Sequence, residues 1–330
     1  MRGLLLNPDT MRSLVEAGNI QKFSELLYKT PYKEDFKKLS QTKIDAATLE
    51  NIFYQKFIDR VDHITRVAPE NMASFFRAHY FMKLEIQNLK RIFRGKFSNT
   101  LVDRIKRVLL PAPPGSIINF DRLAEADTLE TCVHLLGNTI YAPIKETLSL
   151  CKAYDALWPM ETKLNNIYVN VTLDSVAKIP SGNKEKLKRI IEAETDVENL
   201  LLAIAWRKST KKPPRLEDVF QLTYKISKKE IERIIAGKDL TEAIKSLASP
   251  YNEIAEPITY DDEALVRTRL RKHICKETLR DTLIDDFGFS CIMSYLILCE
   301  IEKDDLSTIA WGLENNVRAE KILRYLATTS

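Results

Sequence analysis

Apolar residues along this chain recur most often at helical spacing. One stripe advances by four, three, four, three and four residues through Phe75, His79, Met82, Ile86, Leu89 and Phe93. That spacing places the side chains on one face of a helix, which we expect to end at Gly95. Glycine is scarce, at 9 of 330 residues, although sheets and phosphate-binding loops both depend on it. We therefore predict an all-helical protein with short turns.

The pattern of apolar and polar positions occurs three times along the chain. A segment that ends in Leu-Leu-x-x-Thr-x-Tyr at Tyr32 recurs at Tyr141, and a looser copy ends at Tyr251. The three tyrosines lie 109 and 110 residues apart. Upstream of the first two tyrosines, the residues from Leu14 match those from Leu123 in register.

A second repeated element follows each tyrosine. It pairs an acidic residue with Asn or Asp three positions later, in the combinations Glu85/Asn88, Asp196/Asn199 and Glu302/Asp305. The Asn or Asp lies 54 to 58 residues after the tyrosine of its copy. Elements that recur in the same order at similar spacing indicate that one helical unit has been triplicated.

The length of the repeat indicates domains rather than a superhelix. Solenoid repeats usually span about 20–50 residues, whereas about 110 residues is the size of a small domain. We expect breaks near the proline-rich segment 111–115 and near residues 227–229. The predicted domains are residues 1–117, 118–228 and 229–330, each a helical copy of the same unit.

One segment gives conflicting local signals. Residues 165–176 alternate apolar and polar side chains, as a half-buried strand does. Their counterpart in the first copy, residues 50–61, places Ile52, Phe53 and Phe57 on one side of a helix. Because copies of one unit share one fold, we predict helices for both segments.

Charge argues against a nucleic-acid partner. The chain has 50 Lys and Arg against 46 Asp and Glu, a net charge of +4, which exerts little long-range attraction on phosphates. The densest basic stretch, residues 207–229, also contains acidic residues and has few aromatic side chains on which bases could stack. It is interpreted as a solvated linker and helix face rather than a phosphate-binding patch.

Cysteines and apolar runs indicate the compartment. The five cysteines form no Cys-x-x-Cys pair, which is typical of a protein from a reducing cytoplasm. The longest apolar stretch, residues 291–299, is far shorter than the ~20 residues that span a bilayer. We expect a chain in a reducing cytoplasm that does not cross a membrane.

No arrangement typical of an active site is found. The four histidines lack metal-ligand spacing, and His79, on the apolar stripe, is interpreted as a hydrogen-bonded core residue. Neighbouring acids in a helix point about 100° apart, so helix-start or surface positions are expected for the adjacent pairs. These pairs are Asp261–Asp262, Asp285–Asp286 and Asp304–Asp305. We predict no catalytic residue, cofactor, metal or small-molecule substrate.

The repeated acid/Asn pairs are the polar feature that the triplication singles out. Three-residue spacing places both side chains on one helix face. Asn and Asp are poor residues for a helix interior, so their recurrence indicates a specific hydrogen bond. Two interpretations stay open: the side chains cap a neighbouring helix or hold the Thr-x-Tyr turn, or they contact a partner. The structural one is favoured, because buried polar groups usually satisfy the backbone.

Three segments together resemble a known family. They are Glu-Ile-Gln-Asn-Leu-Lys-Arg-Ile-Phe-Arg-Gly-Lys at residues 85–96, Asp-Val-Glu-Asn-Leu at 196–200, and a run with Leu265, Leu270–Lys272, Phe287–Gly288, Tyr295 and Glu302. The chain resembles the C subunit of archaeal and bacterial A/V-type ATP synthases, whose family includes the d subunit of the eukaryotic vacuolar proton pump. The third copy departs from the pattern by carrying Asp305 in place of Asn.

The resemblance implies a fold and a role. The fold would be three similar helical domains arranged as a funnel with pseudo-threefold symmetry. The protein would be a non-catalytic, peripheral subunit on the cytoplasmic face of the cell membrane. It would act as an adapter between the membrane rotor ring and the central stalk, and so couple proton transport to ATP synthesis or hydrolysis.

The resemblance also implies partners. These would be the proteolipid subunits of the rotor ring and the central-stalk subunits, with membrane contact only through the ring. The isolated chain would be monomeric. Its partner-binding residues are unknown from the sequence.

Two rival interpretations remain at this point. One is a general helical scaffold that binds a partner helix or peptide in a groove and is unrelated to rotary ATPases. The other is an all-helical enzyme with a carboxylate-bound metal, for which Asp261, Asp262 and Glu263 form the nearest cluster. No second acidic cluster matches it, which argues against the enzyme.

Overall fold

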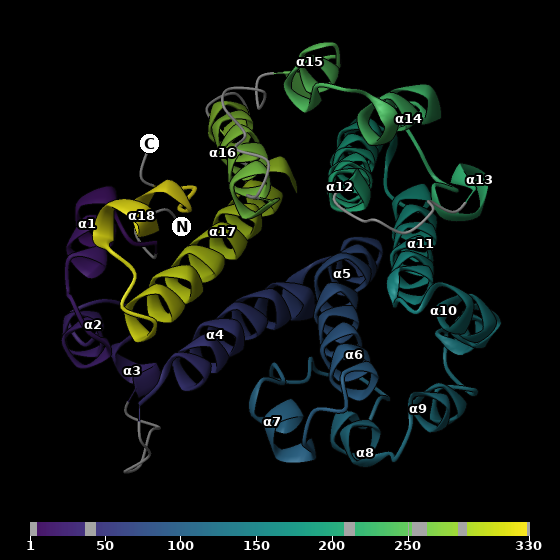
Figure 1. Cartoon of the computed structure of the whole chain (residues 1–330). Coiled ribbons are helices and arrows are strands. Elements are labelled where there is room, and N and C mark those ends of the chain that lie inside the picture. The colour runs from purple at the N-terminus through teal and green to yellow at the C-terminus, as the bar shows by residue number, and fades with distance from the viewer. Residues whose placement is uncertain are drawn as a thin grey trace. The chain divides into compact units, whose positions relative to one another are not determined.

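The structure is a computed structural model that describes residues 5–36, 44–207, 215–249, 251–252, 263–282 and 289–328. Within these ranges every regular element is a helix, which confirms the all-helical prediction (Figure 1). Six residues of the sequence motifs lie outside the described ranges: Asp261, Asp262, Asp285, Asp286, Phe287 and Gly288.

The chain forms two compact units. Unit 1 comprises residues 1–60, 196–213 and 224–330, and unit 2 comprises residues 61–195 and 214–223. Two long helices, α4 (Ala46–Val67) and α12 (Ser181–Arg207), contribute residues to both units. The division into three repeat domains stays a prediction.

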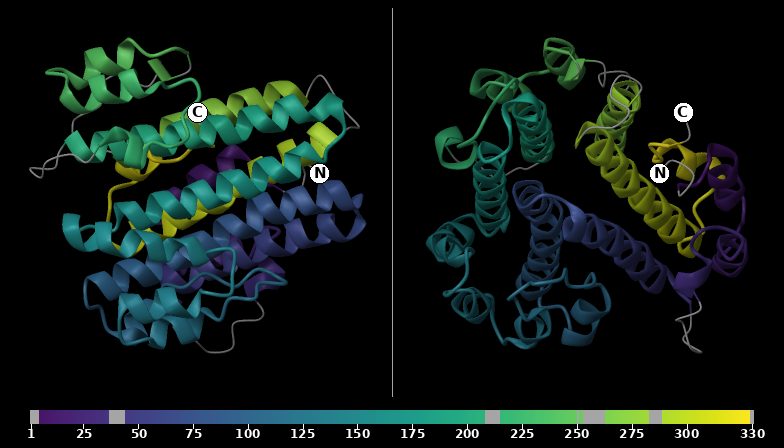
Figure 2. Two further views of the ribbon diagram at one scale, coloured as in Figure 1. Left: turned by 90° about the vertical axis from the view of Figure 1, so that its right-hand side faces the viewer. Right: turned by 180° about the vertical axis from the view of Figure 1, so that it is seen from behind.

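Unit 1 brings the two ends of the chain into one core. Its N-terminal helices pack with α17 and α18, so that Leu14 and Phe23 share a core with Leu306 and Ile322. The two longest helices of its C-terminal part, α16 and α17, lie side by side (Figure 2). Besides parts of α4 and α12, its helices are α1 (Pro8–Val15), α2 (Ile20–Leu27), α3 (Lys33–Phe36), α14 (Lys228–Ala236), α15 (Leu240–Lys245), α16 (Glu263–Thr282), α17 (Phe289–Glu314) and α18 (Ala319–Arg324).

Unit 2 is built around a rod of three successive helices, α5, η2 and α6 (Figure 1). The middle one, η2, is a turn of π-helix, and all three pack against α11. Besides parts of α4 and α12, the helices of unit 2 are α5 (Glu70–Phe76), η2 (Arg77–Phe81), α6 (Met82–Phe97), α7 (Val102–Arg107), α8 (Phe120–Glu125), α9 (Leu129–Leu135), η3 (Ala142–Thr147), α10 (Leu148–Tyr154), α11 (Trp158–Ala177) and α13 (Leu216–Val219).

Each copy of the repeat starts with the same pair of short helices. These pairs are α1 and α2, α8 and α9, and α14 and α15. Every one of the six helices begins at a polar side chain that accepts a hydrogen bond from a backbone N–H of its first turn, an N-cap that stabilises a helix by about 1 kcal/mol. The caps are Asn7, Asn19, Asn119, Thr128, Ser227 and Asp239.

The segment with conflicting signals is helical in both copies. Residues 165–176 lie within α11, and residues 50–61 lie within α4, so both predictions are confirmed. The alternation at Ile167, Val169 and Val171 did not produce a strand, because α11 packs its buried residues against α5, η2 and α6. Tertiary packing overrides local strand propensity here.

The predicted end of the striped helix at Gly95 is wrong by two residues, because α6 continues to Phe97. Gly95 does not end the helix but lets another one approach. A Cβ at this position would lie 2.5 Å from Cγ1 of Ile105 on α7. Asn99 ends the turn instead, with a φ of 51°, a left-handed conformation that Asn tolerates better than most residues.

Candidate functional site

The Thr-x-Tyr turn is held by its own threonine. The hydroxyl of Thr30 donates to the Leu27 carbonyl at 2.6 Å and accepts from the backbone N–H of Tyr32 at 3.2 Å. Thr139 makes the equivalent bonds, at 2.8 Å and 3.1 Å, in the turn before Tyr141. This local bonding is why the turn has the same form in both copies, and it directs each tyrosine into the protein, where 1% of its surface is exposed.

Each buried tyrosine donates a hydrogen bond to the repeated acid of a different copy. The tyrosine of the second copy binds the acid of the first, that of the third binds the second, and that of the first binds the third. The contacts are Tyr141 to Glu85 at 2.7 Å, Tyr251 to Asp196 at 3.3 Å and Tyr32 to Glu302 at 2.8 Å. The first lies in unit 2 and the others lie in unit 1. The three contacts therefore link the copies in a closed cycle.

The carboxylate of Glu302 accepts hydrogen bonds from three residues in the N-terminal part of the chain. Besides Tyr32, its carboxylate accepts from the backbone N–H of Leu6 at 2.6 Å and from Arg60 at 3.2 Å. Burial and the charge of Glu302 raise the pKa of Tyr32 well above its ordinary value, so this hydroxyl stays protonated and donates. The carboxylate thus fixes the first residues of the described chain, the tyrosine turn and α4 to α17.

Asp196 has a comparable set of donors. It accepts from the backbone N–H groups of Tyr224, Lys225 and Ile226, at 3.1 Å, 2.8 Å and 3.2 Å. Burial raises the pKa of Asp196, and these N–H groups oppose the rise by binding the carboxylate. The side chain fixes the segment that leads into α14.

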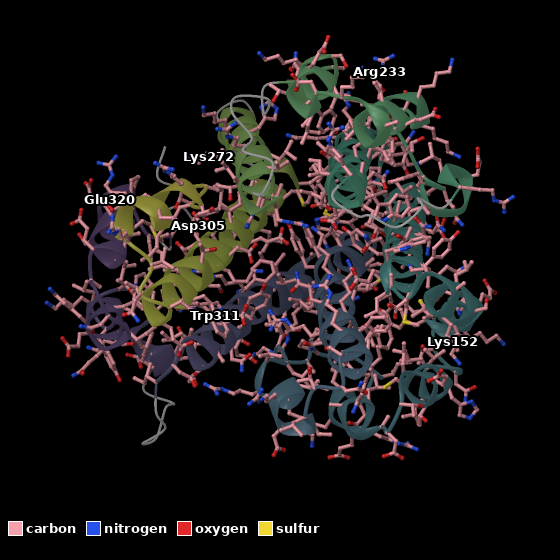
Figure 3. All side chains as sticks on the ribbon, viewed as in Figure 1. Lys152, Arg233, Lys272, Asp305, Trp311 and Glu320 are labelled. Atoms are coloured by element: carbon pink, nitrogen blue, oxygen red, sulfur yellow. The ribbon has the colours of Figure 1, made fainter. Side chains whose placement is uncertain are left out.

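The second member of each repeated pair also binds backbone. Asn88 accepts from the N–H of Leu110 at 2.8 Å and donates to its carbonyl at 2.9 Å. Asp305, labelled on α17 in Figure 3, accepts from the N–H of Ala327 at 3.0 Å and from the N–H and hydroxyl of Thr328 at 2.9 Å and 2.7 Å. The partner follows 22 residues after the side chain in both copies. Asp stands in place of Asn where Ala327 and Thr328 supply three donors, all of which a carboxylate can accept from.

Asn199, the corresponding residue of the second copy, is half-buried on α12. Asp196, the acid of the same repeated pair, is fully buried on this helix. The three tyrosines and the three acids of the repeat thus make contacts between copies, whereas Asn88 and Asp305 bind backbone groups of their own copies.

A partly buried charge cluster around α17 was not predicted from the sequence. The ammonium of Lys303, on a side chain 3% exposed, lies 2.7 Å from Asp304 and 3.8 Å above the ring of Tyr54. Arg271 of α16 also pairs with Asp304. Burial alone would raise the pKa of Asp304, but Arg271 and Lys303 lower it to about 2. The cluster joins α4, α16 and α17 through satisfied charges.

The expectation that adjacent acids occupy helix starts or the surface is wrong for Asp305, whereas Asp304, although away from a helix start, keeps 24% of its side chain exposed. Both lie in the interior of α17, and Asp305 is 1% exposed. The two side chains point in different directions, as expected, but each finds donors of the protein: Asp304 pairs with Arg271 and Lys303, and Asp305 accepts from Ala327 and Thr328. The cations that pair with Asp304, Arg271 and Lys303, are present in the sequence, but residue spacing alone does not show that they pack against it.

A contact between a glycine and an isoleucine of the next helix recurs in two copies, and it was also not predicted from the sequence. Gly312 approaches Ile322 as Gly95 approaches Ile105: a Cβ there would lie 2.7 Å from Cδ1 of Ile322. In both copies Asn follows the glycine by four residues and isoleucine by ten. The backbone N–H of the residue after each Asn donates to the glycine carbonyl at 2.8 Å. This Gly-x3-Asn-x5-Ile spacing is visible in the sequence, although the second copy carries Trp206 at the glycine position.

The described carboxylates of this site bind donors of the protein itself. No group of three or more His, Cys, Asp or Glu suited to a metal ion occurs among the residues that the structure describes. The acidic cluster of the enzyme hypothesis involves Asp261 and Asp262, which lie outside the described ranges. None of the helices described has both the length and the apolar character needed to cross a membrane.

Fold and site together define an all-helical repeat protein whose repeated polar side chains bind its own turns. The family model of the ATP synthase (C/AC39) subunit matches residues 1–325. The chain belongs to this family.

Curated relatives span nearly the whole chain. A protein of Methanococcoides burtonii is 24% identical over 99% of this chain and 91% of its own length. One of Methanocaldococcus jannaschii is 22% identical over 96% and 81%, and one of Archaeoglobus fulgidus is 21% identical over 99% and 93%. All three are named as the C subunit of an A-type ATP synthase.

Proposed function

We propose that this chain is a non-catalytic subunit of a rotary A/V-type ATP synthase, placed between the membrane rotor ring and the central stalk. The observation that carries the proposal is the match of the ATP synthase subunit family over residues 1–325. The names of the relatives agree with it. In this role the chain passes torque between ion flow through the ring and ATP chemistry in other subunits.

The polar contacts support a mechanical role. An adapter needs resistance to deformation more than it needs reactive groups. Each charge-assisted hydrogen bond contributes about 1.5–3 kcal/mol, and such bonds recur where one copy of the repeat meets another. The buried pairing of Lys303 with Asp304 adds a contact that cannot be broken without leaving a buried charge.

We further propose the three-domain funnel with pseudo-threefold symmetry, with domains at residues 1–117, 118–228 and 229–330. The cycle of contacts supports it. A linear array of three copies needs two tyrosine–acid contacts, whereas a closed arrangement needs a third between the first and last copies. Tyr32 and Glu302 make that third contact.

The partners proposed are the ring proteolipids on one side and the central-stalk subunits on the other, at the cytoplasmic face of the membrane. Contact with lipid would run only through the ring. Interfaces of this kind combine an apolar centre with a polar rim.

Affinity purification tests the proposal. The chain is tagged in its native cells, membranes are solubilised gently, and the purified material is cross-linked and analysed by mass spectrometry. We expect cross-links from this chain to both ring proteolipids and central-stalk subunits. Recovery of the chain alone, or with partners unrelated to an ATPase, would reject the proposed role. A tagged catalytic subunit provides the reciprocal control, since it must recover this chain.

A further inference from the structure

A histidine is buried in the π-helical turn of unit 2. His79 is 0% exposed, and its ring stacks on Phe75 with centroids 5.4 Å apart and planes 12° apart. Tyr80 meets it edge-on at 4.6 Å. A π-turn disturbs the regular helical hydrogen bonding, and π-turns are frequent at functional positions. Here the Thr172 hydroxyl of α11, which donates to the Tyr168 carbonyl at 2.8 Å, also lies 3.4 Å from the carbonyl of Ala78.

Four side chains from four helices form a closed ring of hydrogen bonds at this turn. Lys83 of α6 donates to Oε1 of Glu194 on α12 at 2.6 Å, and Tyr168 of α11 donates to Oε2 of the same carboxylate at 3.0 Å. His79 closes the ring, with Nδ1 2.8 Å from the Tyr168 hydroxyl and Nε2 3.4 Å from the Lys83 ammonium. The ring joins the rod of α5, η2 and α6 to α11 and α12.

One placement of the protons satisfies all four contacts. The hydroxyl hydrogen of Tyr168 is used on Glu194, so the Tyr168 oxygen accepts from Nδ1–H of His79. Lys83 has only donors, so Nε2 of His79 must present a lone pair to it. In this placement His79 is neutral, with its hydrogen on Nδ1, and the ring carries one positive and one negative charge.

A second arrangement of the same four groups lies close to this one. Oε1 of Glu194 is 3.9 Å from Nε2 of His79, just beyond hydrogen-bonding distance. A proton on Nε2 would face the Lys83 ammonium at 3.4 Å, donor against donor and cation against cation. Lys83 would have to leave, and Oε1 could then accept from His79. Lys83 and Glu194 are 19% and 25% exposed, so the ammonium has a route to water.

We propose that this ring is a pH-dependent switch, in which protonation of His79 transfers Glu194 from Lys83 to the imidazolium. Above the pH at which His79 is protonated, the ion pair of Lys83 and Glu194 links α6 to α12. Below that pH, His79 of the π-turn binds Glu194 of α12, and Lys83 is solvated. Around His79 lie Lys83 from α6, Tyr168 from α11, Glu194 from α12, the ring of Phe75 from α5 and the ring of Tyr80 from η2 itself. The inference goes beyond the proposed adapter role and does not depend on it.

Nitrogen-15 NMR of histidine-labelled full-length chain tests the switch. His79 is assigned by comparison with a His79→Asn variant, and the exposed His134 serves as the internal control. At pH 8 we expect His79 to be neutral with its hydrogen on Nδ1. Between pH 8 and pH 5 the folded chain should convert to doubly protonated His79. A hydrogen on Nε2 at pH 8, or a neutral His79 throughout this range, would overturn the proposal.

Two variants separate a switch from a histidine that titrates without exchanging partners. Lys83→Met removes the competing cation and should raise the midpoint of the His79 titration by about one pH unit, whereas Glu194→Gln should lower it by a similar amount. Unchanged midpoints in both variants would contradict the exchange. If either variant fails to fold, the titration of the unmodified chain still decides whether the first step occurs.

Discussion

The hydroxyl of Tyr32 donates a 2.8 Å hydrogen bond to Oε1 of Glu302, 270 residues further along the chain. The same carboxylate accepts from Leu6 and Arg60. This buried acid therefore adds polar contacts between the first and last copies of the repeat, which also share an apolar core. The other two tyrosine–acid contacts join copies that follow each other in sequence, so this one alone closes the cycle.

Removing the Tyr32 hydroxyl tests the strength of this closure. Tyr32→Phe should lower the free energy of unfolding by about 1.5–3 kcal/mol, because the acceptor is a buried carboxylate. Tyr28→Phe is the matched control, since Tyr28 is 42% exposed, and its change should stay within about 0.5 kcal/mol. Denaturant titration followed by circular dichroism measures both. Equal effects of the two substitutions would contradict a structural role for the buried hydroxyl.

Exchanging Asn and Asp at the repeated position tests the hydrogen-bond assignment. Asn88→Asp should be destabilising by about 2 kcal/mol or more, because a carboxylate would face the Leu110 carbonyl that Asn88 now donates to. Asp305→Asn should cost less, since an amide oxygen can still accept from Ala327 and Thr328. Thermal unfolding of the two variants measures the difference. The reverse order of destabilisation would show that the bonding is assigned wrongly.

The close approach at Gly95 predicts opposite effects of one substitution at two glycines. Gly95→Ala would place a methyl group 2.5 Å from Ile105 Cγ1 and should destabilise by about 1–3 kcal/mol. Gly182→Ala, in α12, meets nothing within 4 Å and should stabilise by up to about 1 kcal/mol. Unfolding midpoints of the two single variants decide the matter. Stabilisation by Gly95→Ala would remove the packing explanation for this glycine.

The charge cluster around Asp304 predicts a specific dependence of stability on pH. Its pKa of about 2 in the folded chain lies below the ordinary value of about 3.9. The stability contributed by ionised Asp304 is therefore present above about pH 4 and is lost as the pH falls towards about 2. Asp304→Asn should lower the free energy of unfolding at pH 7 by about 2–3 kcal/mol.

The matched control for that variant is Asp103→Asn, which changes an exposed carboxylate on α7. It should shift the stability at pH 7 by no more than about 0.5 kcal/mol. The difference between wild type and Asp304→Asn should shrink between pH 4 and pH 2 in urea titrations. A difference that stays constant over this range would show that the paired charge is not its source.

The repeat made much of the fold predictable from sequence. Helices at residues 50–61 and 165–176 followed from requiring one structure in all copies, and that requirement corrected a local strand signal. The acid/Asn pairs were recognised because they recur. Register and periodicity are properties of a single segment and its copies, so they can be read without knowing what packs against what.

The contacts between copies could not be predicted in the same way. Nothing near Tyr141 indicates that its partner is Glu85 of the preceding copy, because the pairing is decided by tertiary packing. The interior position of Lys303 could not be predicted for a related reason. A lysine next to an aspartate in the sequence is normally interpreted as a solvent-exposed pair, and only the tertiary neighbours show otherwise. The π-turn at His79 left no signal either, since its aromatic residues fit an ordinary apolar stripe.

The role proposed for this chain is to couple the membrane ring to the rest of the ATPase. ATP-driven ion transport in membrane vesicles from cells depleted of the chain tests this role. We predict that transport is lost while the catalytic subunits still hydrolyse ATP, and that adding back the purified chain restores transport. Full ATP-driven transport in vesicles that lack the chain would contradict the account.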